Sequence, residues 1–349
     1  MRSCLVLAVV LAAACAPAPK SVASERSGSE SPGAPPKEMA AAVAQAQQLA
    51  ALGQAAREAS ELACAPLLKR EVGWSEEHAI GRVIAVQLLA GAGRLFLDEV
   101  PGQAPRKPGD DLRTLEAPLP QSPKNALTGH LAVVGKRLAR FSSRPDQPWV
   151  FGVIDTDEPN ALSTAGGYVF VTTGLLRKMT NEAQLAGVLA HEIGHVTQKH
   201  SLGKYLDAKH KQCVAAKYAV FMVEHSGLRS PASEDLARYS RNFDAPDLDA
   251  SDSGFLHFIM QAMMLVMQQG NDRDAEFQTD KLALELVSFA GYDAAEYGPF
   301  LAANAQPRHP TGAERAARLE ALRQGPLKNL PHGTARPDLA KVFAPLGRR

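Results

Sequence analysis

Apolar residues recur at helical spacing over most of the chain. Residues 38–63 are dense in Ala, Gln, Leu and Glu, which favour helices. A second helix is expected from Ser75, where SEEH offers an N-cap followed by glutamates, to about Leu97. Proline and glycine crowd residues 101–123, which are expected to form a loop. Residues 125–141 again predict a helix, with apolar positions three or four apart at Leu127, Leu131, Val134 and Leu138.

One segment departs from the helical pattern. Residues 148–176 contain two β-branched and aromatic runs, WVFGVID and YVFVTT, which predict two paired strands. The next segment, TNEAQLAGVLAHEIGHVTQKH, predicts a helix with Thr180 or Asn181 as its N-cap. The fold class is therefore α+β, mainly α, with a small sheet beside this helix. Residues 226–253 are polar and irregular, and further helices are expected at 206–225, 255–269, 273–290 and 311–323.

The first 37 residues do not resemble a folded domain. Residues 1–15, MRSCLVLAVVLAAAC, have the composition and length of a signal peptide, and small residues precede Cys15. A lipoprotein signal would leave Cys15 lipidated at the mature N-terminus, and an ordinary signal peptide cut nearby is the alternative. Residues 16–37 are rich in Pro, Ser, Gly and Ala and predict a disordered tether. One large domain over residues 38–325 and a tail over 326–349 complete the expected organisation.

Charge content argues against one class of partner, and cysteine content bears on a possible disulfide. Lys and Arg number 38 against 37 Asp and Glu, and no long run of like charges occurs, so nucleic acid is not expected as a partner. An exported chain would place Cys64 and Cys213 in an oxidising compartment. Two isolated cysteines have no diagnostic spacing, so a disulfide between them stays open.

The motif HEIGH points to a metal site. His191 and His195 lie four residues apart on a predicted helix, so both imidazoles project from one face and can share an ion. Glu192 lies beside them, where a carboxylate can take a proton from water. The alternative is a surface helix with two solvated histidines. Gly194 within the helix argues for close packing instead, since glycine there costs about 1 kcal/mol.

A catalytic zinc ion needs a third protein ligand. Glu276 and Asp280 are four residues apart on a predicted helix, so Glu276 could complete a His₂Glu set. Asp280 could then accept the free N–H of a zinc-bound histidine. Spacing alone leaves open an acidic helix with Glu276 in water.

Four separated stretches resemble the gluzincin zinc metallopeptidases of family 48. This family includes the HtpX-like and CAAX prenyl endopeptidases and the BepA- and LoiP-like periplasmic proteases. The stretches, in family order, are NALSTAGGYVFVTTGLL, NEAQLAGVLAHEIGHVTQKH, DRDAEFQTDKLALELVSFAGYD and HPTGAERAARLEAL. The resemblance covers about residues 70–325. It implies one Zn²⁺ per chain, with His191, His195 and Glu276 as metal ligands. It also implies Glu192 as the general base and Asp280 as a hydrogen-bond acceptor of a ligand histidine.

The resemblance also suggests residues that contact substrate. Asn160 matches a family asparagine. Gly166 and Gly167 let the backbone turn sharply or approach a ligand. They precede the strand that begins at Tyr168, and an extended peptide could pair with this strand if it lies at an edge of the sheet. The chain departs from the family by Ala165 where proline is usual and by Thr279 where alanine is usual.

Two further residues come from the fourth stretch. His309 corresponds to a family histidine that can approach the zinc and block it, or could donate to an oxyanion during turnover. Arg315 corresponds to a family arginine, and we take it as a substrate-binding candidate. His200 is a weaker candidate, because it would face away from His195 on a regular helix.

The resulting functional prediction is a zinc endopeptidase of the cell envelope. It would act on unfolded or extended polypeptides, as a periplasmic or outer-membrane-attached lipoprotein or as a secreted soluble protein. The alternatives are a non-hydrolytic envelope chaperone or assembly factor with an autoinhibited zinc site, and a structural zinc lipoprotein. Residues 201–272 exceed a simple connection and are expected to form a lid that acts with His309.

Overall fold

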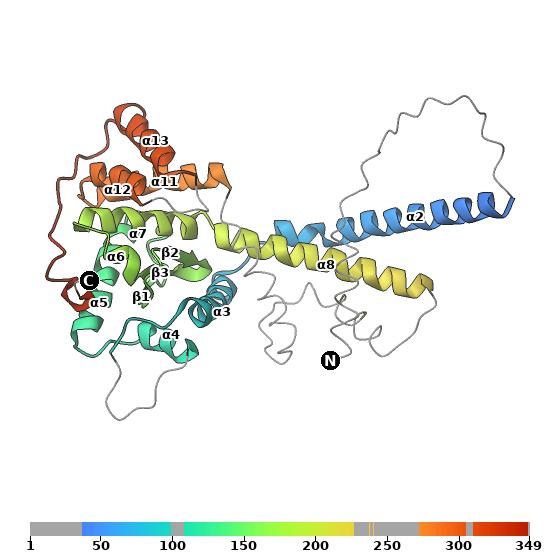
Figure 1. Ribbon diagram of the computed structural model, residues 1–349, viewed down its shortest axis with the longest axis horizontal. Helices are drawn as coiled ribbons and strands as arrows, with labels where there is room; N and C mark the ends of the chain where they lie inside the picture. Colours follow the sequence, from blue (N-terminus) through green and yellow to red (C-terminus); the bar gives the residue numbers. More distant parts are fainter. Residues whose placement is uncertain are drawn as a thin grey trace. The chain divides into compact units, whose positions relative to one another are not determined.

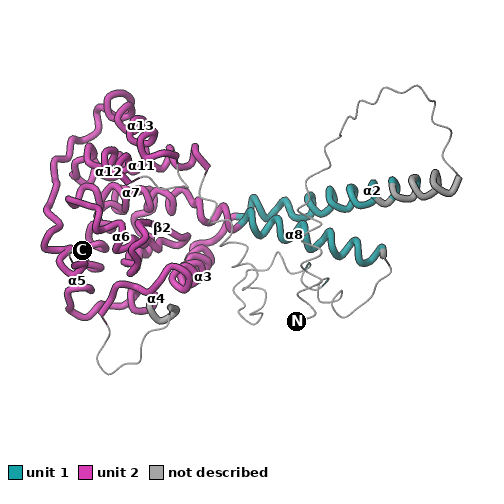
Figure 2. The backbone as a smooth tube through the Cα atoms, viewed as in Figure 1, with its two compact units in different colours: residues 1–70, 206–246 teal, residues 71–205, 247–349 magenta. Residues whose placement is uncertain are grey.

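The computed structural model describes residues 37–98, 108–226, 237, 240, 272–304 and 310–347. They fall into two compact units, residues 1–70 with 206–246 and residues 71–205 with 247–349 (Figure 2). The signal, the tether up to residue 36, residues 255–269 and most of the expected loop at 226–253 lie outside the described residues. No described helix combines the length and apolar composition needed to cross a bilayer.

The first unit contains α2 (Lys37–Cys64), the short helix η1 (Ala65–Lys69) and most of α8 (His200–Ser226). A disulfide joins Cys64 at the end of α2 to Cys213 in α8, with their Cα atoms 6.0 Å apart. The Arg57 guanidinium lies 5.3 Å from the centre of the Tyr218 ring. These contacts fix the two helices side by side (Figure 1).

The second unit is built on a three-stranded sheet of order β1-β3-β2. β1 (Val150–Ile154) pairs parallel with β3 (Tyr168–Thr172), and β2 (Ala161–Thr164) pairs antiparallel with β3. The two predicted strands are therefore present and paired. The short strand β2 was not predicted, because its sequence ALST has neither clear alternation nor large apolar residues.

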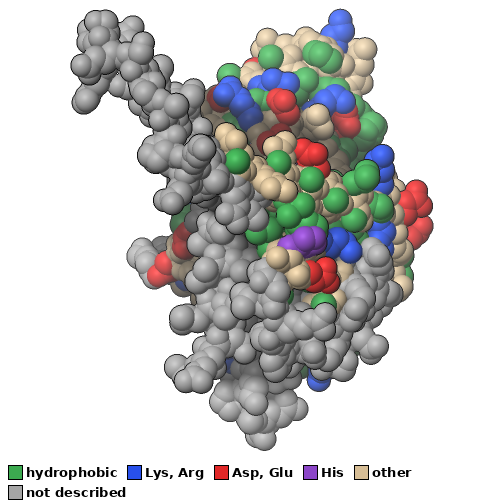
Figure 3. All heavy atoms as spheres, turned by 90° about the vertical axis from the view of Figure 1, so that its right-hand side faces the viewer, with side chains coloured by type: hydrophobic (Ala, Val, Ile, Leu, Met, Phe, Trp, Pro, Cys, Tyr) green, Lys and Arg blue, Asp and Glu red, His purple; other side chains and the backbone are tan. Residues whose placement is uncertain are grey.

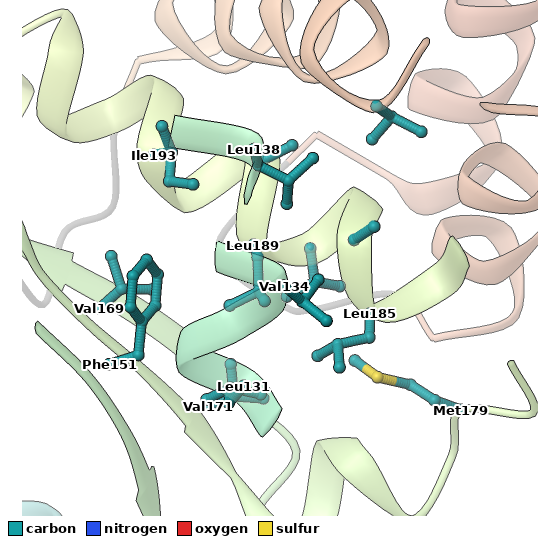
Figure 4. Close-up of a cluster of buried hydrophobic side chains, with 14 of the residues drawn as sticks. Leu131, Val134, Leu138, Phe151, Val169, Val171, Met179, Leu185, Leu189 and Ile193 are labelled. Carbon is teal, nitrogen blue, oxygen red and sulfur yellow. The ribbon is translucent and has the colours of Figure 1, made fainter. Parts of the chain in front are cut away.

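Side chains that alternate along the strands enter two separate cores. On one side, Ile154, Tyr168 and Phe170 pack with α3 (Trp74–Ala92) and α4 (Pro108–Glu116). On the other, residues of α5 (Pro123–Ala139) and α7 (Glu182–Thr197) point towards the strands and one another (Figure 4). The labelled members of this second core are Leu131, Val134, Leu138, Phe151, Val169, Val171, Met179, Leu185, Leu189 and Ile193.

Helices α11, α12 and α13 complete the second unit beyond α7 (Figure 1). They span Arg273–Phe289, Tyr297–Ala303 and Gly312–Gln324, and α11 packs against α7 along much of its length. Between β3 and α7 lies the one-turn helix α6 (Thr173–Leu176). Three-residue helical turns occur at η2 (Ala165–Gly167), η3 (Ala294–Glu296) and η4 (Ala344–Leu346).

The fold class predicted from the sequence, mainly α with a small sheet, is confirmed. Some element predictions were wrong. The second helix begins at Trp74 with Gly73 as its N-cap, so Ser75 lies inside the helix and does not cap it. The second helix ends at Ala92 rather than near Leu97, because Gly93 has φ +122° and Leu95 bridges to Ile154. The segment 101–123 contains the helix α4, where Leu112 packs into the core and outweighs the surrounding prolines.

The residues after 325 contribute to the second unit's core. Leu339 and Leu346 are buried within the cluster around α5 and α7. Two isolated β-bridges join the segment to the rest of the unit, Asn181 with Asp338 and Tyr292 with Ala335.

Candidate metal centre

Helix α7 places the HEIGH motif in the interior of the second unit. Its N-cap is Asn181, whose side chain accepts a hydrogen bond from the Gln184 N–H at 3.1 Å. Every residue from 185 to 196 is buried. His191 and His195 are 5% and 7% exposed, which is inconsistent with a surface helix of solvated histidines.

Helix α11 supplies the carboxylates. Asp272 caps its N-terminus, and Glu276 and Asp280 point from one face towards α7. The two helices approach closely at Gly194, where an added Cβ would lie 2.7 Å from the Thr279 Cγ2. The close packing expected from Gly194 is therefore present, and its partner is the side chain of Thr279.

Three potential ligand groups converge where the helices meet. Single ligand atoms of His191, His195 and Glu276 all lie within 4.8 Å of one another. The two histidine Nε2 atoms are 2.9 Å apart, and Glu276 oxygens lie 3.2 Å and 3.4 Å from the Nε2 atoms of His191 and His195. Ligands of a tetrahedral zinc ion, held at about 2.0–2.2 Å, lie roughly 3.3 Å from one another. The donor set and its spacing therefore fit zinc.

The other nitrogen of His191 faces a charged network. Its Nδ1 lies 3.0 Å from the Asp280 Oδ1. Arg315 donates to both Asp280 oxygens, from Nε at 2.8 Å and from an Nη at 2.6 Å, and Tyr297 donates to Asp280 at 3.3 Å. Burial raises the pKa of Asp280, but its hydrogen bonds with Arg315 and His191 outweigh this and lower the pKa to about 2. Asp280 is thus an anion beside the Nδ1 of His191.

The same carboxylates make the site attractive to a cation. Burial and the charge of Arg315 lower the pKa of His191, but hydrogen bonds with Asp280 and Glu276 outweigh them and raise it to about 9. A divalent cation bound here would face the same two carboxylates and would displace the proton from the metal-directed nitrogen of His191.

Glu192 lies at the edge of this site, next to the sheet. The Ser163 hydroxyl of β2 donates to the Glu192 Oε2 at 2.8 Å. A pocket beside it is lined by Ala161, His191, Glu192 and Arg315, together with Pro310 and residues of α12. Ala161 of β2, the potential ligand His191 and the Glu192 carboxylate therefore face the same pocket.

The residues expected to contact substrate have different positions. β3 is the central strand, so it is not the edge that peptide pairing at Tyr168 would require. Gly166 and Gly167 have φ +74° and +96°, and the η2 turn they form packs against His78 of α3 and against Gln147 and Pro148. The Tyr168 hydroxyl is engaged by Glu116 and His78.

Asn160 and Arg315, which were expected to contact substrate, form hydrogen bonds with other residues of the chain. The Asn160 carbonyl accepts from the Thr172 N–H at 2.9 Å and so joins the turn before β2 to the end of β3. Arg315 is 5% exposed, and its guanidinium is engaged by Asp280 and Tyr297. His309 lies outside the described residues.

The expectation for His200 was wrong. α7 does not continue as a regular helix, since Gln198 and Lys199 form a turn in which Lys199 has φ +58°. His200 starts α8 and lies with its Nδ1 2.7 Å from the Nδ1 of His195. Ser163 and Tyr297 are the site residues that the sequence analysis missed. Ser163 lay within a family-like stretch, whereas nothing local marked Tyr297.

Comparison with known proteins agrees with this arrangement. The model of peptidase family M48 matches residues 125–323, more than half of the chain. The chain belongs to peptidase family M48. The match includes all three potential ligands, Glu192 and the network around Asp280.

Named relatives cover shorter stretches. The Beta-barrel assembly-enhancing protease of Escherichia coli strain K12 is 43% identical over 84 residues, 24% of this chain and 17% of the relative. That of Yersinia pestis is 27% identical over 190 residues, 54% of this chain and 35% of the relative. The Mitochondrial metalloendopeptidase OMA1 of Schizosaccharomyces pombe is 37% identical over 87 residues, 25% and 26% of the two chains. The matches thus span about a third or less of these M48 relatives.

Breaking the network behind His191 should weaken metal binding. Asp280→Ala removes the acceptor of His191, and Arg315→Ala removes the two hydrogen bonds that Asp280 accepts from the guanidinium. We expect each to raise the zinc dissociation constant about 10- to 100-fold, as measured by competition with a chromophoric chelator. Arg323→Ala is the matched control, since Arg323 lies on the same helix and pairs with Glu320. Unchanged zinc affinity in both network variants would contradict this assignment.

Proposed function

We propose that this chain is a zinc-dependent endopeptidase of the cell envelope, with His191, His195 and Glu276 as ligands and Glu192 as general base. The observation that supports it best is the buried convergence of the three ligand groups, with Glu192 adjacent to one of them. A purely structural zinc site would not need a carboxylate facing the pocket. Membership of family M48 supports the same conclusion.

The roles of the residues follow from their contacts. A bound zinc ion would polarise the scissile carbonyl and lower the pKa of water. Glu192 accepts a proton from the attacking water and delivers it to the leaving amine. Ser163 orients the carboxylate through its 2.8 Å hydrogen bond, and Asp280 holds His191 in the tautomer that leaves Nε2 for the metal.

Replacing the base should separate catalysis from metal binding. Glu192→Gln leaves the three ligands intact, so we expect stoichiometric zinc and a loss of casein cleavage of roughly 10²- to 10⁴-fold. The measurements are zinc content by mass spectrometry and the rate of casein cleavage with and without chelator. Glu285→Gln is the control, because Glu285 pairs with Lys281 on the far end of α11. Zinc loss in parallel with activity would contradict the role of Glu192.

We propose that an extended substrate peptide pairs with β2 instead of β3. Within the described residues β2 is at the edge of the sheet, and Ala161 lines the same pocket as His191 and Glu192. The Thr172 N–H bonds to the Asn160 carbonyl, so the antiparallel alternation directs the backbone groups of Ala161 and Ser163 to the outer side. An extended peptide added there would run beside Glu192.

A proline can test this edge. Ala161→Pro removes an outward N–H without removing a ladder bond to β3, and proline is tolerated on edge strands. We expect kcat/KM for casein to fall about 3- to 10-fold, the effect of one lost hydrogen bond, at unchanged zinc content. Ala161→Gly keeps the N–H and is the control. Equal activity of Ala161→Pro and wild type would rule out pairing through this group.

The envelope assignment rests on separate observations. Residues 1–15 have the composition and length of a signal peptide, and the Cys64–Cys213 disulfide is typical of an oxidising compartment. Two relatives are named for enhancing β-barrel assembly. The proposed substrates are therefore unfolded or misassembled envelope polypeptides, including β-barrel proteins.

The anchor can be tested independently of the active site. If Cys15 is lipidated, Cys15→Ser should move the chain from the membrane fraction to the soluble fraction, because the lipid is the main anchor. Fractionation followed by mass spectrometry of the mature N-terminus measures this. An unlipidated N-terminus in wild type would instead support simple secretion.

A further inference from the structure

The turn after α7 brings a third histidine to the candidate metal centre. Residues 198 and 199 interrupt the helix, with Lys199 at φ +58°, and His200 returns towards the site. The rings of His195 and His200 meet edge to face, with centroids 5.0 Å apart and an interplanar angle of 61°. This places the His200 Nδ1 2.7 Å from the His195 Nδ1.

The two nitrogens at this distance must share one proton, because two lone pairs 2.7 Å apart would repel. The Nε2 of His195 faces Glu276 and His191, so it is the metal-directed nitrogen and has no proton when it is a ligand. A neutral His195 then has its proton on Nδ1 and donates it to His200. His200 must accept through Nδ1 and keep its own proton on Nε2.

Thr279 also lies near the His195 Nδ1, but its contact is weaker than that of His200. Its hydroxyl lies 3.5 Å from that nitrogen, at the outer limit of a hydrogen bond. It donates instead to the Ala275 carbonyl at 2.8 Å and accepts from Gln198 at 3.2 Å. Thr279 therefore closes the space beside His195, while His200 provides the shorter contact.

We infer that His200 is the positioning residue of the second zinc ligand. It accepts the Nδ1–H of His195, as Asp280 does for His191, and so fixes the tautomer and the ring orientation of His195. The two ligands thereby have unlike acceptors, an anionic carboxylate and a neutral imidazole. This inference rests on the zinc site of the proposed function.

Variants can show whether His200 acts as a hydrogen-bond acceptor or only fills space beside His195. His200→Leu removes the acceptor, whereas His200→Asn keeps an oxygen near the position of Nδ1. We expect the zinc dissociation constant to rise about 10- to 100-fold in His200→Leu and to stay within about 3-fold of wild type in His200→Asn. Bound Co²⁺ should show altered visible bands in His200→Leu only. His225→Leu is the control, because His225 lies on the same helix and bonds to the Phe221 carbonyl.

A measurement on the wild-type chain gives a second test that needs no variant. In the zinc-loaded protein labelled with ¹⁵N-histidine, two-bond ¹H–¹⁵N couplings report the tautomer of each ring. We expect His200 to be neutral with its proton on Nε2, and His195 to have its proton on Nδ1.

The outcomes distinguish this inference from the function it rests on. If wild type binds no zinc, the proposed function fails. If wild type binds zinc and His200→Leu binds it equally well, or His200→Asn loses as much affinity as His200→Leu, the positioning role is wrong. A proton on the Nδ1 of His200 in the zinc-loaded wild type would also overturn it.

Discussion

The packing of α11 against α7 is the constraint on which the site depends. The helices can approach closely because residue 194 is glycine, and a Cβ there would meet the Thr279 side chain at 2.7 Å. At this separation the carboxylate of Glu276 lies within 3.4 Å of both imidazole Nε2 atoms. A wider spacing would leave the histidines with no third ligand. The mid-helix glycine, unfavourable for α7 alone, is thus explained by the metal centre.

Around this contact, polar and charged side chains from several elements form a network beside His191. Asp280 from α11, Arg315 from α13 and Tyr297 from α12 form one buried network behind His191. Buried charges are costly unless they are paired, so Asp280 and Arg315 stabilise each other, and the neutral Tyr297 hydroxyl is a further donor to Asp280. On the face drawn in Figure 3, by contrast, described acidic and basic side chains are interspersed with apolar and polar ones.

Much of the fold and site could be predicted because the relevant signals are local. The helical periods of α5, α7 and α11 and the strand runs of β1 and β3 predicted real elements. The i,i+4 spacing placed His191 with His195, and Glu276 with Asp280, on the faces that meet. The features that the sequence did not predict depend on long-range contacts or on single backbone angles. β2 is stabilised by its pairing with β3, and α4 is stabilised by burial of Leu112. The position of His200 depends on the single positive φ angle at Lys199. The strand order, which makes β2 rather than β3 the edge, has no local sequence signal.

The central claim is that one zinc ion is held by residues from α7 and α11. The most direct measurement is a crystal structure of the zinc-loaded chain, with anomalous diffraction recorded at the zinc edge. The account predicts one anomalous peak per chain at about 2.0–2.2 Å from the Nε2 atoms of His191 and His195 and from an oxygen of Glu276. A peak coordinated by other residues, or a Glu276 carboxylate turned away from the ion, would contradict it.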